Sequence, residues 1–203
     1  MKEKSFLFNR IANIYGLFFN KQKKAYNNII ENIKNDFDFS AYESVIDIGC
    51  GTGALCVALS KCNLKVTGVD PAVEMLSIAA KKTHEKKYNL QDIEYIHGNV
   101  LEGLPFENKS FDLAISSYVA HGFNENERLT LYNEMRRIAK YAIVIFDYNE
   151  KRSIIVDIIE WLEGGDYFNF IKSVKEELIT QFGDVAVVNI GKYTDAYICK
   201  LQL

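Results

Sequence analysis

The chain has 203 residues, enough for one folded domain with a hydrophobic core, and its 48% hydrophobic and 25% charged content is typical of soluble globular proteins. Its 24 basic and 27 acidic side chains give a net charge of −3, which disfavours a duplex-binding surface because such surfaces carry a basic excess. The first residues lack a secretory hydrophobic region and no apolar run reaches the roughly 18 residues that span a bilayer, so we expect a cytoplasmic monomer or homodimer with no membrane span.

The predicted elements begin with a helical segment that covers about the first forty residues. Its apolar positions recur at helical spacing, and we expect it to pack as a lid across the carboxyl end of the first strand. These positions are Ile11, Ile14, Leu17 and Phe18.

From residue 44 onward, short apolar runs alternate with longer amphipathic runs. The runs that predict strands are 45–48, 65–69, 93–97, 111–116 and 142–146. The runs that predict helices are 54–60, 72–82 (with Val73, Leu76, Ala79 and Ala80 on one face) and the segment after Asn124. Asn124 and Glu127 predict a capping box for that last helix, which carries Leu129, Tyr132, Met135 and Ile138.

The tail departs from this alternation. Two helices are predicted at 153–162 and 168–182, followed by an antiparallel pair of strands at 185–190 and 196–201 on the sheet edge. The helix 153–162 is either a substrate cover or simple edge packing.

Alternating strands and helices predict an α/β fold with a doubly wound, mostly parallel, Rossmann-like sheet of seven strands and an antiparallel edge. We expect a single domain, with a helical lid at 1–43, a core at 44–147 and the terminal elements at 148–203. Ligands of such folds lie at the carboxyl ends of the strands. Polar or glycine residues occur at five of these ends: Gly49, Asp70, Asn99, Ser116 and Asp147.

The strongest local pattern is VIDIGCGTG, residues 45–53. Gly49, Gly51 and Gly53 directly after a buried strand allow a sharp turn, the approach of a ligand to the backbone, and close packing of the next helix. This GxGxG spacing differs from the GxGxxG pattern of dinucleotide-binding proteins.

Asp70 ends the second strand, 21 residues after Gly49. A carboxylate there can accept hydrogen bonds from both hydroxyls of an adenosine ribose. It can also cap the helix that starts near Pro71, and the two roles are compatible. We expect Asp70 near the surface, so that its removal spares the fold.

These segments, with VTGVDPAVEML (66–76) and IHGNVLEGLPFENKSFDLAISSYVAH (96–121), resemble the class I S-adenosylmethionine-dependent methyltransferases, in particular the ubiquinone/menaquinone-type small-molecule enzymes. The resemblance covers about residues 44–147. It implies an enzyme that uses S-adenosyl-L-methionine to methylate a small-molecule acceptor, without a metal.

The resemblance also implies roles for individual residues. Asp47 would help place the cofactor ammonium, and Gly49, Cys50, Gly51 and Gly53 belong to the turn around the methionine moiety. Residues implied for the ribose, the adenine and the remaining cofactor contacts are Asp70, Pro71, Ala72, Met75, Asn99, Val100, Ser116 and Tyr15. Family members commonly have Asp where this chain has Asn99, and often Tyr-Asp where it has Tyr15-Gly16.

Methyl transfer needs alignment and sometimes a base that removes a proton. His121 is the first candidate, because imidazole titrates near neutral pH, and Tyr118 follows it as a pocket residue. His121 could equally cap the next helix. Asp147 and Tyr148 are weaker candidates for the base.

The four cysteines, Cys50, Cys56, Cys62 and Cys199, form no CxxC pair and predict reduced thiols rather than a zinc site. Two alternatives to a small-molecule enzyme stay open. A nucleic-acid or protein methyltransferase would need a basic groove, and the Asn/Asp-Pro-Pro-Tyr/Phe motif is replaced here by SSYVAH. A non-catalytic module would bind the cofactor and transfer no methyl group.

Overall fold

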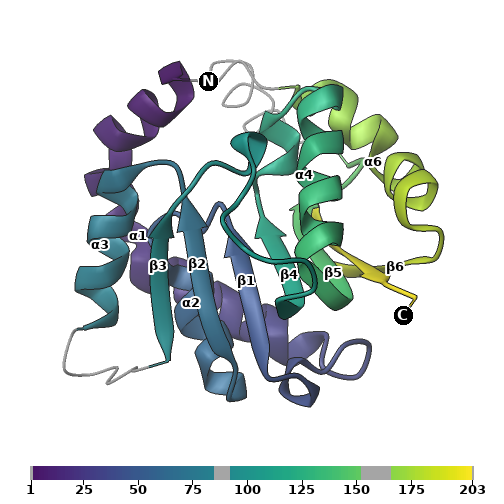
Figure 1. Ribbon diagram of the computed structural model, residues 1–203, viewed down its shortest axis with the longest axis horizontal. Helices are drawn as coiled ribbons and strands as arrows, with labels where there is room; N and C mark the ends of the chain where they lie inside the picture. The colour runs from purple at the N-terminus through teal and green to yellow at the C-terminus, as the bar shows by residue number, and fades with distance from the viewer. Residues whose placement is uncertain (1, 85–91, 152–165, 203) are drawn as a thin grey trace. The chain divides into compact units, whose positions relative to one another are not determined.

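The structure is a computed structural model that describes residues 2–84, 92–151 and 166–202 (Figure 1). It divides into two compact units, Met1–Pro105 and Phe106–Leu203, called unit 1 and unit 2 below. The predicted helix 153–162 lies outside the described residues. Within the described ranges, no helix combines the length and apolar character that a bilayer crossing requires.

Unit 1 contains three parallel strands in the order β3-β2-β1. The strands are β1 (Ser44–Ile48), β2 (Lys65–Asp70) and β3 (Ile93–His97). The helices are α1 (Lys2–Asn32), α2 (Ala54–Leu59) and α3 (Val73–Thr83), with 3₁₀ turns η1 (Phe39–Ala41), η2 (Ser60–Cys62) and η3 (Val100–Glu102). All three strand predictions are confirmed to within one residue.

Helix α1 packs along α2 and α3 (Figure 1). Phe19 of α1 forms a buried cluster with Ala54 and Val57 of α2. A second cluster joins Ala12 of α1 to Ala72 and Met75 at the start of α3. The predicted N-terminal helix is therefore confirmed, and its packing brings it beside the segment that follows β2.

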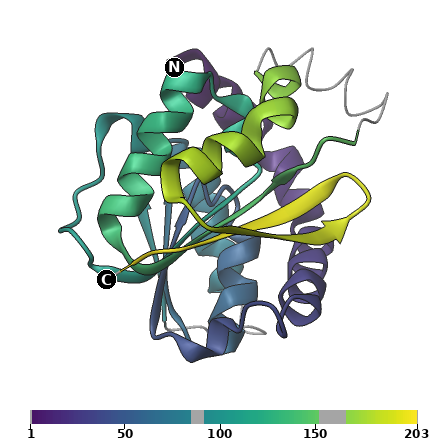
Figure 2. The same ribbon diagram turned by 90° about the vertical axis from the view of Figure 1, so that its right-hand side faces the viewer.

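Unit 2 contains four strands in the order β4-β5-β7-β6. They are β4 (Phe111–Ser117), β5 (Ala139–Tyr148), β6 (Val185–Gly191) and β7 (Thr194–Lys200). β4 and β5 are parallel, and β7 runs antiparallel to both β5 and β6, as predicted for the edge pair (Figure 2). The helical elements are η4 (Ala120–Gly122), α4 (Glu125–Ile138) and α6 (Tyr167–Phe182).

The predicted capping box at the start of α4 is present. The Asn124 side chain accepts a hydrogen bond from the Glu127 amide at 3.1 Å, and the Glu127 carboxylate accepts one from the Asn124 amide at 3.0 Å. Helices α4 and α6 lie side by side in Figures 1 and 2. The Gln181 amide of α6 donates to Asn133 of α4 at 2.7 Å.

The buried faces of two helices differ from the predictions. Val73 is 56% exposed, because α3 buries Met75, Ala79 and Thr83 instead. Leu129 is 45% exposed, since α4 buries the preceding residue, Arg128. On α1, Leu17 and Phe18 are also exposed rather than packed. The other predicted positions fare better, because Ala79 of α3 and Tyr132, Met135 and Ile138 of α4 are buried as expected.

The exposure of Leu129 and the burial of Leu131 on α4 give a direct test with two leucines. Leu131→Ala should lower the free energy of unfolding by about 3 kcal/mol, because the side chain is fully buried and its truncation leaves a cavity. Leu129→Ala should change it by less than about 0.5 kcal/mol, as expected of a surface substitution. Urea unfolding measures both, and equal losses would contradict the observed face.

Candidate functional site

The turn between β1 and α2 is built from glycines in the left-handed region. Gly49, Gly51 and Gly53 have φ values of 78°, 53° and 77°, a conformation that residues with a Cβ rarely adopt. The amides of Gly49 and Cys50 both donate to the carbonyl of Val69, at 2.8 and 3.0 Å. The turn is thereby fixed to the end of β2.

Gly51 and Gly53 serve different needs within this turn. A Cβ on Gly53 would collide with the Tyr95 hydroxyl and lie 3.1 Å from the Ala79 Cβ, so Gly53 allows close packing of the elements around it. A Cβ on Gly51 would meet nothing within 4 Å. The backbone of Gly51 therefore faces open space and can be approached by a ligand.

Asp70 is the last residue of β2, and its carboxylate accepts hydrogen bonds from two backbone amides. Its Oδ2 accepts from the Gly51 amide at 2.9 Å and its Oδ1 from the Ala72 amide at 2.8 Å. Burial raises the pKa of Asp70, while these two amide bonds act to lower it. The helix-capping role proposed from sequence is wrong, because α3 has Ala72 as its N-cap and no side-chain cap, and the bond from Asp70 goes to the Ala72 amide before the helix. The expectation of a surface position is wrong, because Asp70 is only 8% exposed.

Asp47 lies in β1, below the turn, and is 1% exposed. Its Oδ2 accepts from the Cys56 thiol at 3.2 Å, whereas its Oδ1 has no hydrogen-bond partner among the described residues. Burial raises the pKa of Asp47 to about 7, partly offset by the Cys56 bond. Burial also raises the pKa of Cys50 to about 11, so this thiol stays protonated at neutral pH.

The residues predicted around an adenine lie in three elements of unit 1. Met75 is buried, and Tyr15 of α1 packs against its cluster. Val100 is buried at the start of η3. Asn99 caps η3, since its Oδ1 accepts from the Leu101 amide at 3.2 Å and its Nδ2 donates to Glu102 at 2.9 Å. Asn99 is therefore held in place by its own turn.

In unit 2, Ser116 is fully buried near the end of β4, and its Oγ has no hydrogen-bond partner among the described residues. Tyr118 follows with a φ of 54°, unusual for a residue with a side chain. Its ring packs edge-on to Tyr148 with centroids 5.5 Å apart. The end of β4 thus carries a hydroxyl without a partner and an aromatic ring.

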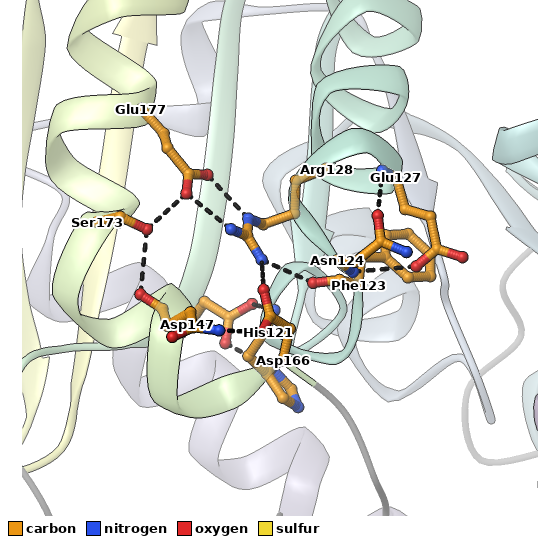
Figure 3. Close-up of polar contacts among 10 residues, drawn as sticks. His121, Phe123, Asn124, Glu127, Arg128, Asp147, Asp166, Ser173 and Glu177 are labelled. Carbon is orange, nitrogen blue, oxygen red and sulfur yellow. Dashed lines mark hydrogen bonds and ion pairs between the residues drawn. The ribbon is translucent and has the colours of Figure 1, made fainter.

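His121 lies in η4 and contacts Asp147 of β5 (Figure 3). Its Nδ1 is 2.7 Å from Asp147 Oδ1, and its backbone amide donates to Oδ2 at 3.3 Å. The ring packs against Tyr148 and Phe170, with centroid distances of 4.8 and 6.4 Å. An ionised carboxylate can only accept, so it favours the tautomer with the proton on Nδ1 and the lone pair on Nε2. Since Asn124 caps α4, His121 does not fill that role.

Sequence reasoning gave Asp147 little weight and missed Arg128 altogether. Asp147 is fully buried at the end of β5 and holds both the ring and the backbone of His121. Arg128 is 2% exposed on the inner face of α4. A signal for Arg128 did exist, because it shares helical spacing with Leu131 and Met135.

Residues 45–141 match the model of a family described as "Methyltransferase domain". A demethylmenaquinone methyltransferase from Oceanobacillus iheyensis is 39% identical over 106 residues, which cover 49% of this chain and 41% of that protein. Residues 45–141 thus match a methyltransferase domain, and the chain is similar to S-adenosylmethionine-dependent methyltransferases. The cofactor of these methyltransferases is S-adenosyl-L-methionine.

A Staphylococcus aureus demethylmenaquinone methyltransferase is 37% identical over 101 residues, or 47% of this chain and 38% of that protein. The chain thus spans about two fifths of the length of the curated relatives it matches.

Solved structures share the fold over almost the whole chain. A methyltransferase from Aquifex aeolicus has a TM-score of 0.67 at 22% identity and covers 91% of this chain and 98% of its own. A Methanococcus maripaludis protein assigned to the same class has a TM-score of 0.73 at 22% identity, with 96% and 94% covered. The predicted fold class, a Rossmann-like α/β fold with a mixed seven-stranded sheet and an antiparallel edge, is confirmed.

Proposed function

We propose that the chain catalyses methyl transfer from S-adenosyl-L-methionine to a small-molecule acceptor. The observation that carries the proposal is the buried Asp47, whose Oδ1 lacks a partner among the described residues. A buried carboxylate oxygen without a partner costs stability unless a ligand satisfies it. The ammonium of a bound amino-acid moiety is such a ligand, and the open face of Gly51 gives it a route to the turn.

The other cofactor contacts are assigned to groups in unit 1. Backbone of Gly49, Cys50 and Gly51 would line the methionine part, and Asp70 would accept bonds from the ribose hydroxyls. Each carboxylate oxygen has two lone pairs, so the bonds to Gly51 and Ala72 leave Asp70 further accepting capacity. The residues assigned to the adenine are Tyr15, Pro71, Ala72, Met75, Asn99 and Val100.

The bound sulfonium supplies an activated methyl group, which leaves the protein to orient the acceptor and to take its proton. We assign the proton to Nε2 of His121. Asp147 accepts from Nδ1–H and stabilises the positive ring that forms. Tyr148 and Phe170 pack against His121, and Tyr118 packs against Tyr148. This aromatic surface favours an apolar, aromatic acceptor with an ionisable hydroxyl. The substrate named for the relatives, demethylmenaquinone, is of this kind in its reduced form.

The ribose assignment is tested by Asp70→Ala. Affinity for S-adenosylhomocysteine, measured by calorimetry, should fall at least about a hundredfold, since two hydrogen bonds to a charged group are lost. The variant should also be less stable, because two backbone amides lose their acceptor. Asp38→Ala is the matched control. Asp38 accepts from the amide two residues ahead at 2.9 Å, as Asp70 does, but lies before β1. Equal affinities for Asp70→Ala and wild type would exclude the ribose role.

The ammonium assignment predicts a dependence of binding on pH. Asp47 has a pKa of about 7 when folded, so it is mostly protonated at pH 6 and mostly ionised at pH 7.5. Only the ionised form attracts the ammonium, and affinity for S-adenosylhomocysteine should therefore rise roughly eightfold across this interval.

Asp47→Asn is the control for this prediction, because it keeps the side-chain volume and removes the titration. Its affinity should be low and nearly independent of pH. A wild-type affinity that stays constant between pH 6 and 7.5, or a variant that keeps the same slope, would contradict the assignment.

The proton-transfer role is tested by His121→Ala in an assay that follows the labelled methyl group of S-adenosylmethionine. Reduced demethylmenaquinone and small phenols are the acceptors to try, with transfer RNA and protein alongside. Turnover should fall about a hundredfold or more, with the affinity for S-adenosylhomocysteine unchanged. His84→Ala removes a histidine at the end of α3 and should keep full activity. Transfer to RNA or protein alone, or to no acceptor, would replace the small-molecule proposal with the corresponding alternative.

A further inference from the structure

A buried guanidinium joins the turn that carries His121 to helix α6 (Figure 3). We propose that Arg128 is a positioning residue, which holds the His121 turn and the aromatic residues of α6 in the arrangement that proton transfer requires. The inference rests on the role proposed for His121. Arg128 itself touches no reacting atom in this scheme.

Arg128 makes four hydrogen bonds through all three guanidinium nitrogens. Its Nε and Nη2 bond to the two carboxylate oxygens of Glu177 at 2.8 and 2.7 Å. Its Nη1 donates to the carbonyl of Phe123 at 2.7 Å and to Asp166 Oδ2 at 2.9 Å. One side chain of α4 therefore connects the residue that follows η4 with both the start and the middle of α6.

These contacts bear on His121 from two directions. The carbonyl of Phe123 lies two residues after His121, so Arg128 fixes one end of the turn while Asp147 fixes the imidazole and its amide. Helix α6 begins beside Asp166 and carries Phe170, whose ring packs against His121. The guanidinium also lies 5.7 Å from the centre of that Phe170 ring. Arg128 thus contacts both the turn that carries His121 and the Phe170 ring that packs against it.

The charge balance explains why the anchor is an arginine. Two carboxylates converge on this position, and Ser173 donates a further hydrogen bond to Glu177. Burial acts to lower the pKa of Arg128, but the bonds to Glu177 and Asp166 outweigh it and keep the group charged. A lysine ammonium is a point charge on a flexible stem and cannot make the planar, paired contact to Glu177 while reaching Phe123.

Helix α4 offers a matched control in Arg137. This residue also pairs through Nε and Nη2 with a glutamate, Glu134, at 2.8 and 2.7 Å. Its Nη1 likewise donates to a loop carbonyl, that of Phe106, and to a polar side chain, that of Asn108. The bonding pattern is the same, but its partners are neither in η4 nor in α6.

The experiment compares Arg128→Met, Arg128→Lys and Arg137→Met in the full chain. Imidazole ¹H–¹⁵N spectra report the tautomer and hydrogen bonding of His121 without any ligand, and His121→Ala assigns its signals among the three histidines. Arg128→Met should shift the His121 nitrogens and lower kcat about tenfold to a hundredfold, as expected when a catalytic group is misplaced. In Arg128→Met, the pH at which kcat changes should shift together with the pH at which the His121 signals titrate. Arg128→Lys should restore little, and Arg137→Met should leave His121 and kcat as in wild type.

A loss of thermal stability in Arg128→Met with unchanged His121 signals and kcat would overturn the proposal. If Arg128→Met does not fold, Glu177→Gln takes its place, because it keeps Arg128 and removes one charge from the pair. It should shift the same signals to a smaller extent, and unchanged signals there would also overturn the proposal. The spectra do not depend on methyl transfer, and calorimetry with S-adenosylhomocysteine reports on the proposed function separately.

Discussion

The arrangement of unit 1 depends on the carboxylate of Asp70, which accepts the Gly51 amide at 2.9 Å and the Ala72 amide at 2.8 Å. Through these two bonds, a single side chain ties the glycine turn to the segment that leads into α3. Because Asp70 is almost fully buried, charged hydrogen bonds of this kind are worth more than they would be in water. A ligand hydroxyl that bonds to Asp70 meets an acceptor whose position is already set, so little ordering remains at binding.

Asp47 differs from Asp70 in how far its hydrogen bonds are satisfied. Asp70 has both oxygens bonded to backbone, whereas Asp47 has one oxygen on the Cys56 thiol and the other without a described partner. Folding alone gives no reason to bury such an oxygen. Burial disfavours the charged form of Asp47, which raises its pKa to about 7. A carboxylate kept under these conditions is best explained by a ligand that supplies the missing charge.

Much of unit 1 could be predicted from sequence because the relevant relations are local. The strand before Gly49 and the acid after the next strand are visible as patterns of a few residues, and the structure places them at one turn. The faces of the helices were harder to predict. Ala79 and Met135 are buried as predicted, but Val73 and Leu129 fit the same apolar spacing and are exposed. The helices bury Met75 and Arg128 at their first turns instead.

Arg128 and Arg137 of α4 show why some contacts around His121 were missed. Arg137 pairs with Glu134, three residues earlier, and this spacing is readable on any predicted helix. The partner of Arg128 is Glu177, 49 residues away, and only the packed fold brings the two together. Pairs close in sequence stabilise the helix that contains them, whereas distant pairs fix one element against another. The contacts that orient His121 belong to the second kind, since Asp147 is 26 residues from it. Residues proposed to position His121 are therefore the ones that this sequence reveals least.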